Sequence, residues 1–147
     1  VGTHVDITDF IHAKAHLKYN ESLFRTAIES VPCDLFALNK DQCYTIQNTI
    51  SKETWGDIIG KCPEDVAEDA ASLALWKENN ERVLKGETIA GKVSMLVKGK
   101  EMSYYNIISP IWNNDAVIGI VGININISDQ QDFESVINDF ERAQFEY

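Results

Sequence analysis

Polar side chains spaced two residues apart in β-rich sequence have the clearest capacity for chemistry. Tyr104 and Asn106 alternate with apolar residues, and Asn124 lies in a second segment of the same kind. Because alternate residues of a strand share one face, Tyr104 and Asn106 point the same way. A phenol and two amides can hydrogen-bond a small organic molecule, but they can also satisfy one another inside a packed core. The residues alone leave both interpretations open.

The expected pocket combines these polar groups with nearby aromatic side chains. Its ligand-binding residues are Tyr104, Asn106, Asn124 and Ser94, with Trp76, Trp55 and Leu84 as apolar walls. The same alternation predicts a second, almost wholly apolar sheet face, composed of Val93, Met95, Val97, Tyr105, Ile107, Ile123 and Ile125. Such a face is unfavourable in water. We therefore expect a homodimer, formed through this face and the flanking helices.

The residues of known catalytic motifs are missing from the sequence. It has no glycine-rich phosphate loop and no G-x-S-x-G elbow, and no histidine follows His16. Cys33, Cys43 and Cys62 are odd in number and lack C-x-x-C spacing. The missing motifs lead us to expect no enzymatic activity. The cysteine pattern leads us to expect no metal site and no disulfide framework, as in a protein of the reducing cytoplasm.

Composition excludes two classes of partner. The 147 residues carry a net charge of −10, which repels a polyanion, so nucleic acid is not an expected partner. No apolar run approaches the roughly 20 residues that a membrane-spanning helix needs. Hydrophobic residues make up 44%, which is ordinary for a globular domain with a real core.

Apolar spacing divides the chain into helices and strands. Phe10, Leu17 and Phe24 recur every seven residues and predict an amphipathic helix over residues 9–31, which Pro32 ends. We predict strands at 34–38, 43–47, 88–98, 101–111 and 116–128, and helical segments at 51–55, 63–67, 70–85 and 129–147. The hairpin linkers are too short for parallel crossovers, so the sheet is antiparallel and the fold class is α+β.

The first eight residues form an internal repeat with residues 121–128. They read VGTHVDIT and VGININIS, and aspartate followed by helical sequence comes next in both places. Because residues 121–128 end a predicted strand, we expect residues 1–8 to be a strand as well, the last one of a preceding domain.

Several short motifs, taken in order, resemble the PAS family. Residues 5–9 resemble the "DIT-E" signature that closes a PAS domain, and residues 21–32 resemble its "SE-x-x-F-R … E-x-x-P" opening. The motifs IIGK at 58–61, ISPI at 108–111 and VIG at 117–119 follow in the expected order. The resemblance covers about residues 20–128 and both helical flanks. The chain departs from the pattern at 126–128, where Asn-Ile-Ser replaces the usual Asp-Ile-Thr.

The resemblance implies a PAS-like five-stranded antiparallel sheet, with short helices on one face and amphipathic helices at both flanks. It divides the chain into residues 1–8, the end of a preceding PAS domain, and residues 9–31, a linker helix. Residues 32–128 are the PAS core, and residues 129–147 are a C-terminal signalling helix. The chain then represents one unit of a tandem array.

Two cofactors of the family are not expected. Flavin-binding members have a Gly-x-Asn-Cys motif, but here Gly60-Lys61-Cys62 places the thiol one position short. We interpret Cys62 as a small apolar filler instead. Haem-binding members use a histidine near the long middle helix, where this chain has none. Asn124 lies where light-sensing members keep a glutamine that contacts the cofactor. The sequence does not identify a cofactor for this chain.

The resemblance also implies a sensory function. The module binds a small molecule or relays a conformational change to neighbouring PAS and output domains, of which a histidine kinase is the first expectation. The alternatives are a ligand-free dimerisation and relay module, or a sensor for a cyclic-dinucleotide cyclase or phosphodiesterase. We expect Asn126, Ser128 and Asp129 to carry the signal, because the closing strand runs there into the final helix.

Overall fold

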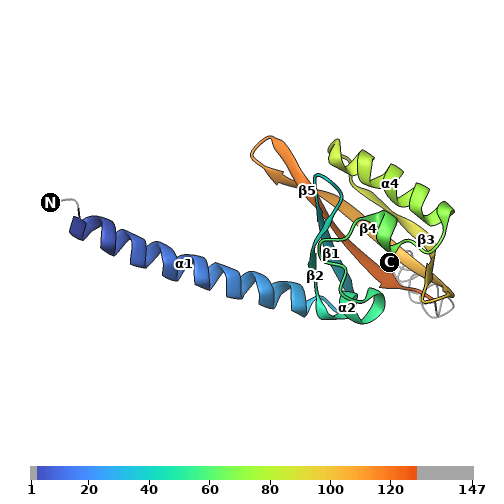
Figure 1. Ribbon diagram of the computed structural model, residues 1–147, viewed down its shortest axis with the longest axis horizontal. Coiled ribbons are helices and arrows are strands. Elements are labelled where there is room, and N and C mark those ends of the chain that lie inside the picture. Colours follow the sequence, from blue (N-terminus) through green and yellow to red (C-terminus); the bar gives the residue numbers. More distant parts are fainter. Residues whose placement is uncertain (1–2, 129–147) are drawn as a thin grey trace, which may run out of the picture. The chain divides into compact units, whose positions relative to one another are not determined.

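The structure, a computed structural model, describes residues 3–128 (Figure 1). The chain divides into two compact units, one up to Pro32 and one from Cys33 onward. The helix expected at 129–147, with Asp129, lies outside the described residues. Among residues 3–128, no helix combines the length and the apolar character needed to cross a bilayer.

The first unit contains a single helix, α1, from Thr3 to Ser30. It confirms the helix predicted over 9–31 and begins earlier than expected. The strand predicted over 1–8 is wrong for residues 3–8, which are helical. A strand needs a neighbouring strand to pair its backbone N–H and C=O groups, whereas a helix pairs them within its own segment. Whether residues 1–8 derive from a preceding domain stays a prediction.

The second unit is built on a five-stranded antiparallel sheet. Its strands are β1 (Asp34–Asn39), β2 (Tyr44–Gln47), β3 (Ile89–Val97), β4 (Lys100–Asn113) and β5 (Ala116–Asn126), in the spatial order β2-β1-β5-β4-β3. Three helices lie between β2 and β3 in the sequence: α2 (Thr49–Trp55), α3 (Pro63–Val66) and α4 (Ala70–Leu84). The predicted α+β class and sheet are thus confirmed, with ends within a few residues of those expected (Figure 1).

Asn48 fixes the start of α2 and ties it to β1. Its Oδ1 accepts from the backbone N–H of Ser51, which caps the helix, and from that of Leu35 in β1. Its Nδ2 donates to the backbone carbonyl of Cys33. With 1% of its surface exposed, Asn48 is a buried polar residue whose groups are all used inside the fold.

The pairing of β3 with β4 corrects the predicted faces of β3. Val93 pairs with Tyr104 and Ser94 with Ser103, so odd-numbered residues of β3 share a face with even-numbered residues of β4. The reason is the two-residue loop between Val97 and Lys100, because a loop of that length pairs residues of opposite parity, and β3 and β4 then pair in one continuous register. Val93, Met95 and Val97 therefore belong to the inner face, and Ser94 and Leu96 to the outer face.

The core lies between the inner sheet face and the helices. One buried cluster joins Leu38, Ile108 and Ile120 of the sheet to Val83 of α4 and to Tyr44 and Ile58. A second cluster contains Met95, Val97 and Tyr104. The outer face is less apolar than predicted, because Val93, Met95 and Val97 lie on the inner face instead. The other predicted residues of the outer face are half-buried there: Tyr105, Ile107, Ile123 and Ile125.

Gly119 is expected to be essential to the approach of β5 to β1. A Cβ atom there would lie 2.5 Å from the backbone oxygen of Leu38, which cannot move without disturbing the sheet. Gly119→Ala should lower the free energy of unfolding by about 1–3 kcal/mol. Gly91→Ala is the matched control, since its Cβ would meet nothing within 4 Å. Urea unfolding followed by tryptophan fluorescence measures both, and equal stabilities would contradict the prediction.

Candidate ligand pocket

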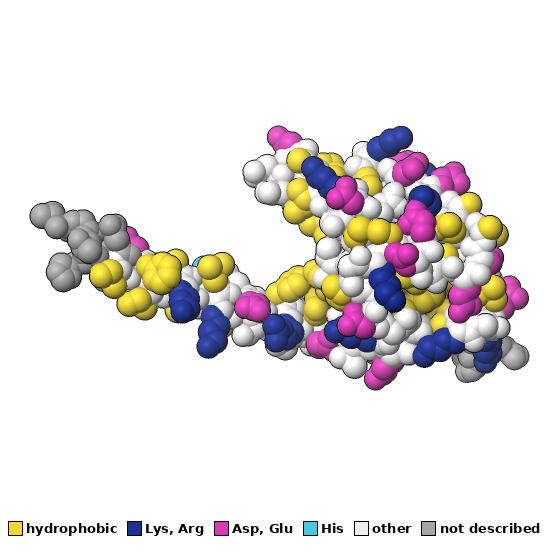
Figure 2. Space-filling model, viewed as in Figure 1, with side chains coloured by type: hydrophobic (Ala, Val, Ile, Leu, Met, Phe, Trp, Pro, Cys, Tyr) yellow, Lys and Arg dark blue, Asp and Glu magenta, His cyan; other side chains and the backbone are white. Residues whose placement is uncertain are grey.

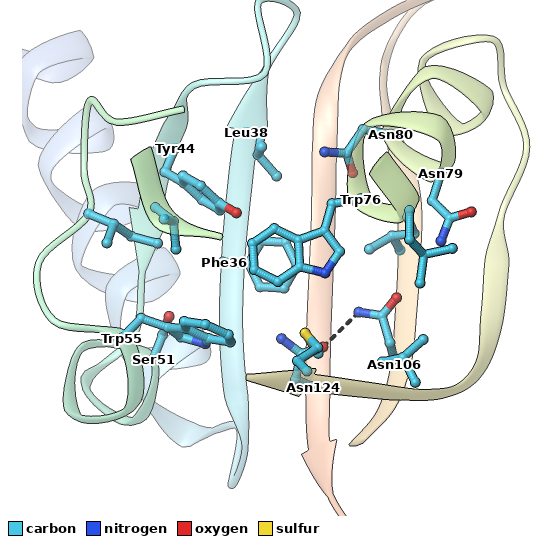
Figure 3. Close-up of a pocket in the computed structure, with 16 residues that line it drawn as sticks. Phe36, Leu38, Tyr44, Ser51, Trp55, Trp76, Asn79, Asn80, Asn106 and Asn124 are labelled. Atoms are coloured by element: carbon cyan, nitrogen blue, oxygen red, sulfur yellow. Dashed lines mark hydrogen bonds between the residues drawn. The ribbon is translucent and has the colours of Figure 1, made fainter. Parts of the chain in front are cut away.

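A partly open cavity of about 50 Å³ lies between the inner sheet face and the helices (Figure 3). This volume is the space open to the centre of a water-sized sphere, of which a single water needs roughly 10–15 Å³. The cavity therefore admits several waters or a small organic molecule. Each strand and each helix between residues 33 and 128 contributes to the wall. The wall consists of Phe36, Leu38, Tyr44, Ser51, Trp55, Ile58, Val66, Leu75, Trp76, Asn79, Asn80, Val93, Met95, Asn106, Ile108 and Asn124.

Aromatic rings form much of the cavity wall. Trp55 of α2 and Trp76 of α4 meet edge to face, with ring centroids 5.7 Å apart. Phe36 and Tyr44 make a second edge contact at 6.0 Å. Such contacts hold rings in fixed orientations. The cavity therefore offers aromatic surfaces to a flat ligand.

A chain of hydrogen bonds runs from a buried carboxylate into the cavity. Asp34 is 2% exposed, and its Oδ2 accepts from Trp55 Nε1 at 2.7 Å and from Asn124 Nδ2 at 3.1 Å. Asn124 Oδ1 in turn accepts from Asn106 Nδ2 at 2.7 Å, the bond drawn in Figure 3. Four side chains from α2, β1, β4 and β5 are thus linked.

The carboxylate sets the direction of this chain. An ionised carboxylate only accepts hydrogen bonds, so Asn124 must turn its NH₂ group toward Asp34 and its oxygen toward Asn106. Asn106 must then turn its own NH₂ group toward Asn124. Its Oδ1 points away from Asn124 in Figure 3, and no donor to it is found among residues 33–128. The cavity consequently presents a hydrogen-bond acceptor at Asn106.

The wall carries no charge. None of its side chains is Asp, Glu, Lys, Arg or His. Burial, and secondarily the charge of Asp34, raises the pKa of Tyr44 and of Tyr104, so both phenols stay neutral. No side chain of the wall offers an ion a counter-charge in exchange for its lost hydration. The cavity therefore suits an uncharged ligand.

The predicted site residues separate into two groups in the structure. Asn106, Asn124, Trp55 and Trp76 meet in the cavity wall. Three others lie elsewhere: Tyr104, which packs beside the cavity with Met95 and Val97, Leu84, which packs against the core, and Ser94, which is exposed on the outer face. The placement of Ser94 in the pocket was wrong, because the hairpin loop reverses the parity of β3.

The sequence reasoning missed Asp34. Its signal was an acidic residue in the apolar strand 34–38, at the parity of Phe36 and Leu38, which face inward. Asp34 Oδ1 is buried and has no hydrogen-bond donor among the described residues. The second carboxylate oxygen is therefore an unused acceptor next to the pocket.

Asn126 and Ser128, two of the three residues expected to carry a signal, lie at and just after the end of β5. The Asn126 Oδ1 accepts from the backbone N–H of Ser128 at 2.9 Å. The Ser128 Oγ accepts from the backbone N–H of Ser103 in β4 at 3.2 Å. The replacement of Asp by Asn at 126 thus keeps a local turn contact through the amide oxygen.

Comparison with known proteins identifies the fold. No protein-family model matches the chain, and no curated protein matches it in sequence. The solved PAS domain of BvgS from Bordetella pertussis is 20% identical, covering 84% of this chain and 98% of that one, with a TM-score of 0.64. The structure of a phage VqmA–DPO complex is 16% identical, covering 91% of this chain and 62% of that one, with a TM-score of 0.65.

A third similar structure is the Vibrio cholerae VqmA dimer, described as a LuxR-type receptor with a target DNA. It is 16% identical and covers 76% of this chain, with a TM-score of 0.63. The chain spans only 52% of that protein and 62% of the phage protein. These likenesses, with the antiparallel sheet in the order β2-β1-β5-β4-β3, show that the second unit has a PAS fold.

Removing the carboxylate of Asp34 should destabilise the fold. Asp34→Ala leaves the Trp55 indole N–H and the Asn124 NH₂ group without acceptors, at about 1–3 kcal/mol for each buried group. Asp34→Asn can keep both bonds with its one oxygen and should lose less. Asp115→Ala, at an exposed turn, serves as the control. Urea unfolding gives the ranking, and an Ala variant as stable as the control would contradict it.

Proposed function

We propose that residues 33–128 are a sensory PAS module that binds a small uncharged organic molecule. The observation that carries the proposal is the acceptor at Asn106 Oδ1, held in a neutral cavity of aromatic and aliphatic side chains. The ligand is flat enough to lie against Trp76 or Phe36, and it donates a hydrogen bond from N–H or O–H. Binding rather than catalysis is the role we assign to the module.

Similar structures support ligand binding at this fold. The phage VqmA structure is described as a complex with DPO, and it shares a fold with this chain. The match is too distant in sequence to transfer the ligand itself. The proposal therefore rests on the cavity of this chain, and the likeness makes a small-molecule ligand a natural first class to test.

We propose that β5 transmits the bound state. Asn124 lies in the cavity wall, and two residues further along the same strand Asn126 contacts the backbone of Ser128. A ligand that pulls on Asn106 displaces Asn124 through their 2.7 Å bond. Such a shift changes output only if two arrangements of the following segment lie close in free energy. Asp129, which follows, is the proposed point of exit.

The output domain we propose is a histidine kinase, with a cyclic-dinucleotide cyclase or phosphodiesterase as the alternative. Tandem sensory units of this fold commonly precede such domains. We propose neighbouring PAS units as further partners, and the cytoplasm as the compartment. Nucleic acid is not proposed as a partner of this chain, because its net charge is −10.

Ligand binding can be tested through the acceptor at Asn106. A library of small neutral heterocycles bearing N–H or O–H groups is screened by thermal shift, and affinities of the hits are measured by tryptophan fluorescence. Asn106→Leu keeps the side-chain size and removes the acceptor, so the Kd should rise about tenfold or more. Ser94→Ala, on the outer face, should leave the Kd unchanged.

Two results would contradict this function. The first is a library without hits while native mass spectrometry of the purified protein shows no retained small molecule. The second is a set of hits whose affinities are equal in the Asn106→Leu and wild-type proteins. Either would favour the alternative of a ligand-free dimerisation and relay module.

A dimer is favoured by the exposed apolar side chains of α1. Phe10 is 67% exposed, Leu17 68% and Phe24 53%, and Figure 2 shows hydrophobic side chains along this helix. A seven-residue repeat of apolar side chains is the pattern of a coiled-coil seam. We propose that the α1 helices of two chains pair through this seam.

The seam can be tested by charge placement. Leu17→Glu with Phe24→Glu buries carboxylates in the proposed interface and should convert dimers to monomers at micromolar concentration. Ala15→Glu with Ser22→Glu is the matched control, because these exposed residues also lie seven apart but on another side of the helix. Analytical ultracentrifugation measures both variants. A wild-type protein that is monomeric, or a seam variant that stays dimeric, would contradict the proposal.

A further inference from the structure

Two of the three cysteines lie in contact in the second unit. The Sγ atoms of Cys43 and Cys62 are 2.9 Å apart, and both residues are partly exposed and unbridged. The separation of nineteen positions along the chain gives no sign of this proximity. Neither thiol lines the cavity, so the pair is a feature separate from the ligand site.

Backbone hydrogen bonds hold the two cysteines together. The N–H of Tyr44 donates to the carbonyl of Lys61, and the N–H of Gly60 donates to the carbonyl of Tyr44, each at 2.8 Å. Cys43 directly precedes Tyr44 and Cys62 directly follows Lys61, so the bond between Tyr44 and Lys61 brings the two cysteines side by side.

Each cysteine is also fixed by its own neighbours. The Cys43 N–H donates to Asn39 Oδ1 at 3.0 Å. The Cys62 N–H donates to Asp65 Oδ2, also at 3.0 Å, at the start of α3. A pair held by four local contacts needs little backbone movement to form a bond, which is the usual obstacle to a disulfide.

We propose that Cys43 and Cys62 are a site of reversible oxidation to an intrachain disulfide, with hydrogen peroxide as the oxidant. One thiolate attacks a peroxide oxygen, the O–O bond breaks, and a sulfenic acid forms while the released hydroxide takes up the proton lost by that thiol and becomes water. The second thiol attacks the sulfenic sulfur, the S–S bond forms, the S–O bond breaks, and the sulfenic hydroxyl leaves as a second water with the proton of the second thiol. A dithiol reductant returns both cysteines to thiols by exchange.

The reaction rate should depend on pH. The hydrogen bond that the Cys62 thiol makes with Cys43, with burial second, raises the pKa of Cys62 to about 11. Cys62 is thus a thiol at neutral pH, and raising the pH increases the thiolate that can react. The bond would close the loop of residues 43–62, which carries Tyr44, Ser51, Trp55 and Ile58 of the cavity wall.

Peptide mapping tests the proposal on the whole chain. Trypsin places the three cysteines on separate peptides: Cys33 on residues 26–40, Cys43 on 41–52 and Cys62 on 62–77. The protein is treated with stoichiometric hydrogen peroxide, its remaining thiols are alkylated under denaturing conditions, and the digest is analysed by mass spectrometry without reductant. We expect peptide 41–52 linked to 62–77, with alkylated Cys33, and loss of the link after dithiothreitol.

Variants separate the pair from the third cysteine. Cys33→Ser should form the same link to the same extent, whereas Cys43→Ser should form none and leave two thiols open to alkylation. Circular dichroism checks that each variant is folded, and the wild-type map stands without them. The proposal is overturned if all three wild-type thiols are alkylated after peroxide, if peptide 26–40 is the linked partner, or if sulfinic acid accumulates without a link.

Discussion

The buried carboxylate of Asp34 is the constraint on which the site depends. It lies in the first strand of the sheet and accepts hydrogen bonds from Trp55 of α2 and from Asn124 of β5. A buried charge costs free energy unless it accepts hydrogen bonds. Because, within the described part of the chain, only Oδ2 of Asp34 accepts such bonds, the carboxylate depends on both partners keeping their positions. In doing so it attaches α2, which carries the Trp55 ring of the cavity wall, to β5, which carries Asn124.

The same constraint gives the pocket its chemical character. An amide can face either way, but an amide held by a carboxylate cannot. The hydrogen bond to Asp34 fixes the orientation of the Asn124 amide, and Asn124 in turn fixes that of the Asn106 amide. The Oδ1 atom of Asn106 is therefore an acceptor in a wall that bears no charge. The carboxylate of Asp34, which is not part of the wall, thus determines where the wall has a hydrogen-bond acceptor. Such an acceptor would distinguish neutral ligands that donate a hydrogen bond from those that do not.

The proposed ligand contact and the proposed point of signal exit lie close together along β5. Asn106 belongs to β4 and Asn124 to β5, the longest pair of neighbouring strands in the sheet. The end of β5 is held to β4 through Ser128 and Ser103. A distortion at the cavity has only one short stretch of strand to cross before it reaches the last described residues, so no long network of contacts is needed.

Local sequence determined the order and type of elements from Asp34 to Asn126, because alternation, helix caps and turn residues act over a few positions. The predicted placement of Asn106 and Asn124 on one face is confirmed, but it depends on a register shift between Ile111 and Trp112, without which the loop before Ala116 would reverse the parity. The prediction from local sequence was wrong at residues 3–8, where a segment of strand-like composition forms a helix. A helix pairs its backbone groups within its own segment and needs no neighbouring strand.

Only the tertiary structure decided which residues meet across the sheet. The face of Ser94 depends on the length of a hairpin loop, and the bond between Asp34 and Asn124 joins positions ninety residues apart. The contact between Cys43 and Cys62 likewise arises from the docking of a loop against β2. Such contacts follow from register and from the path of the chain, and these are set by the packing of the whole domain rather than by any local pattern.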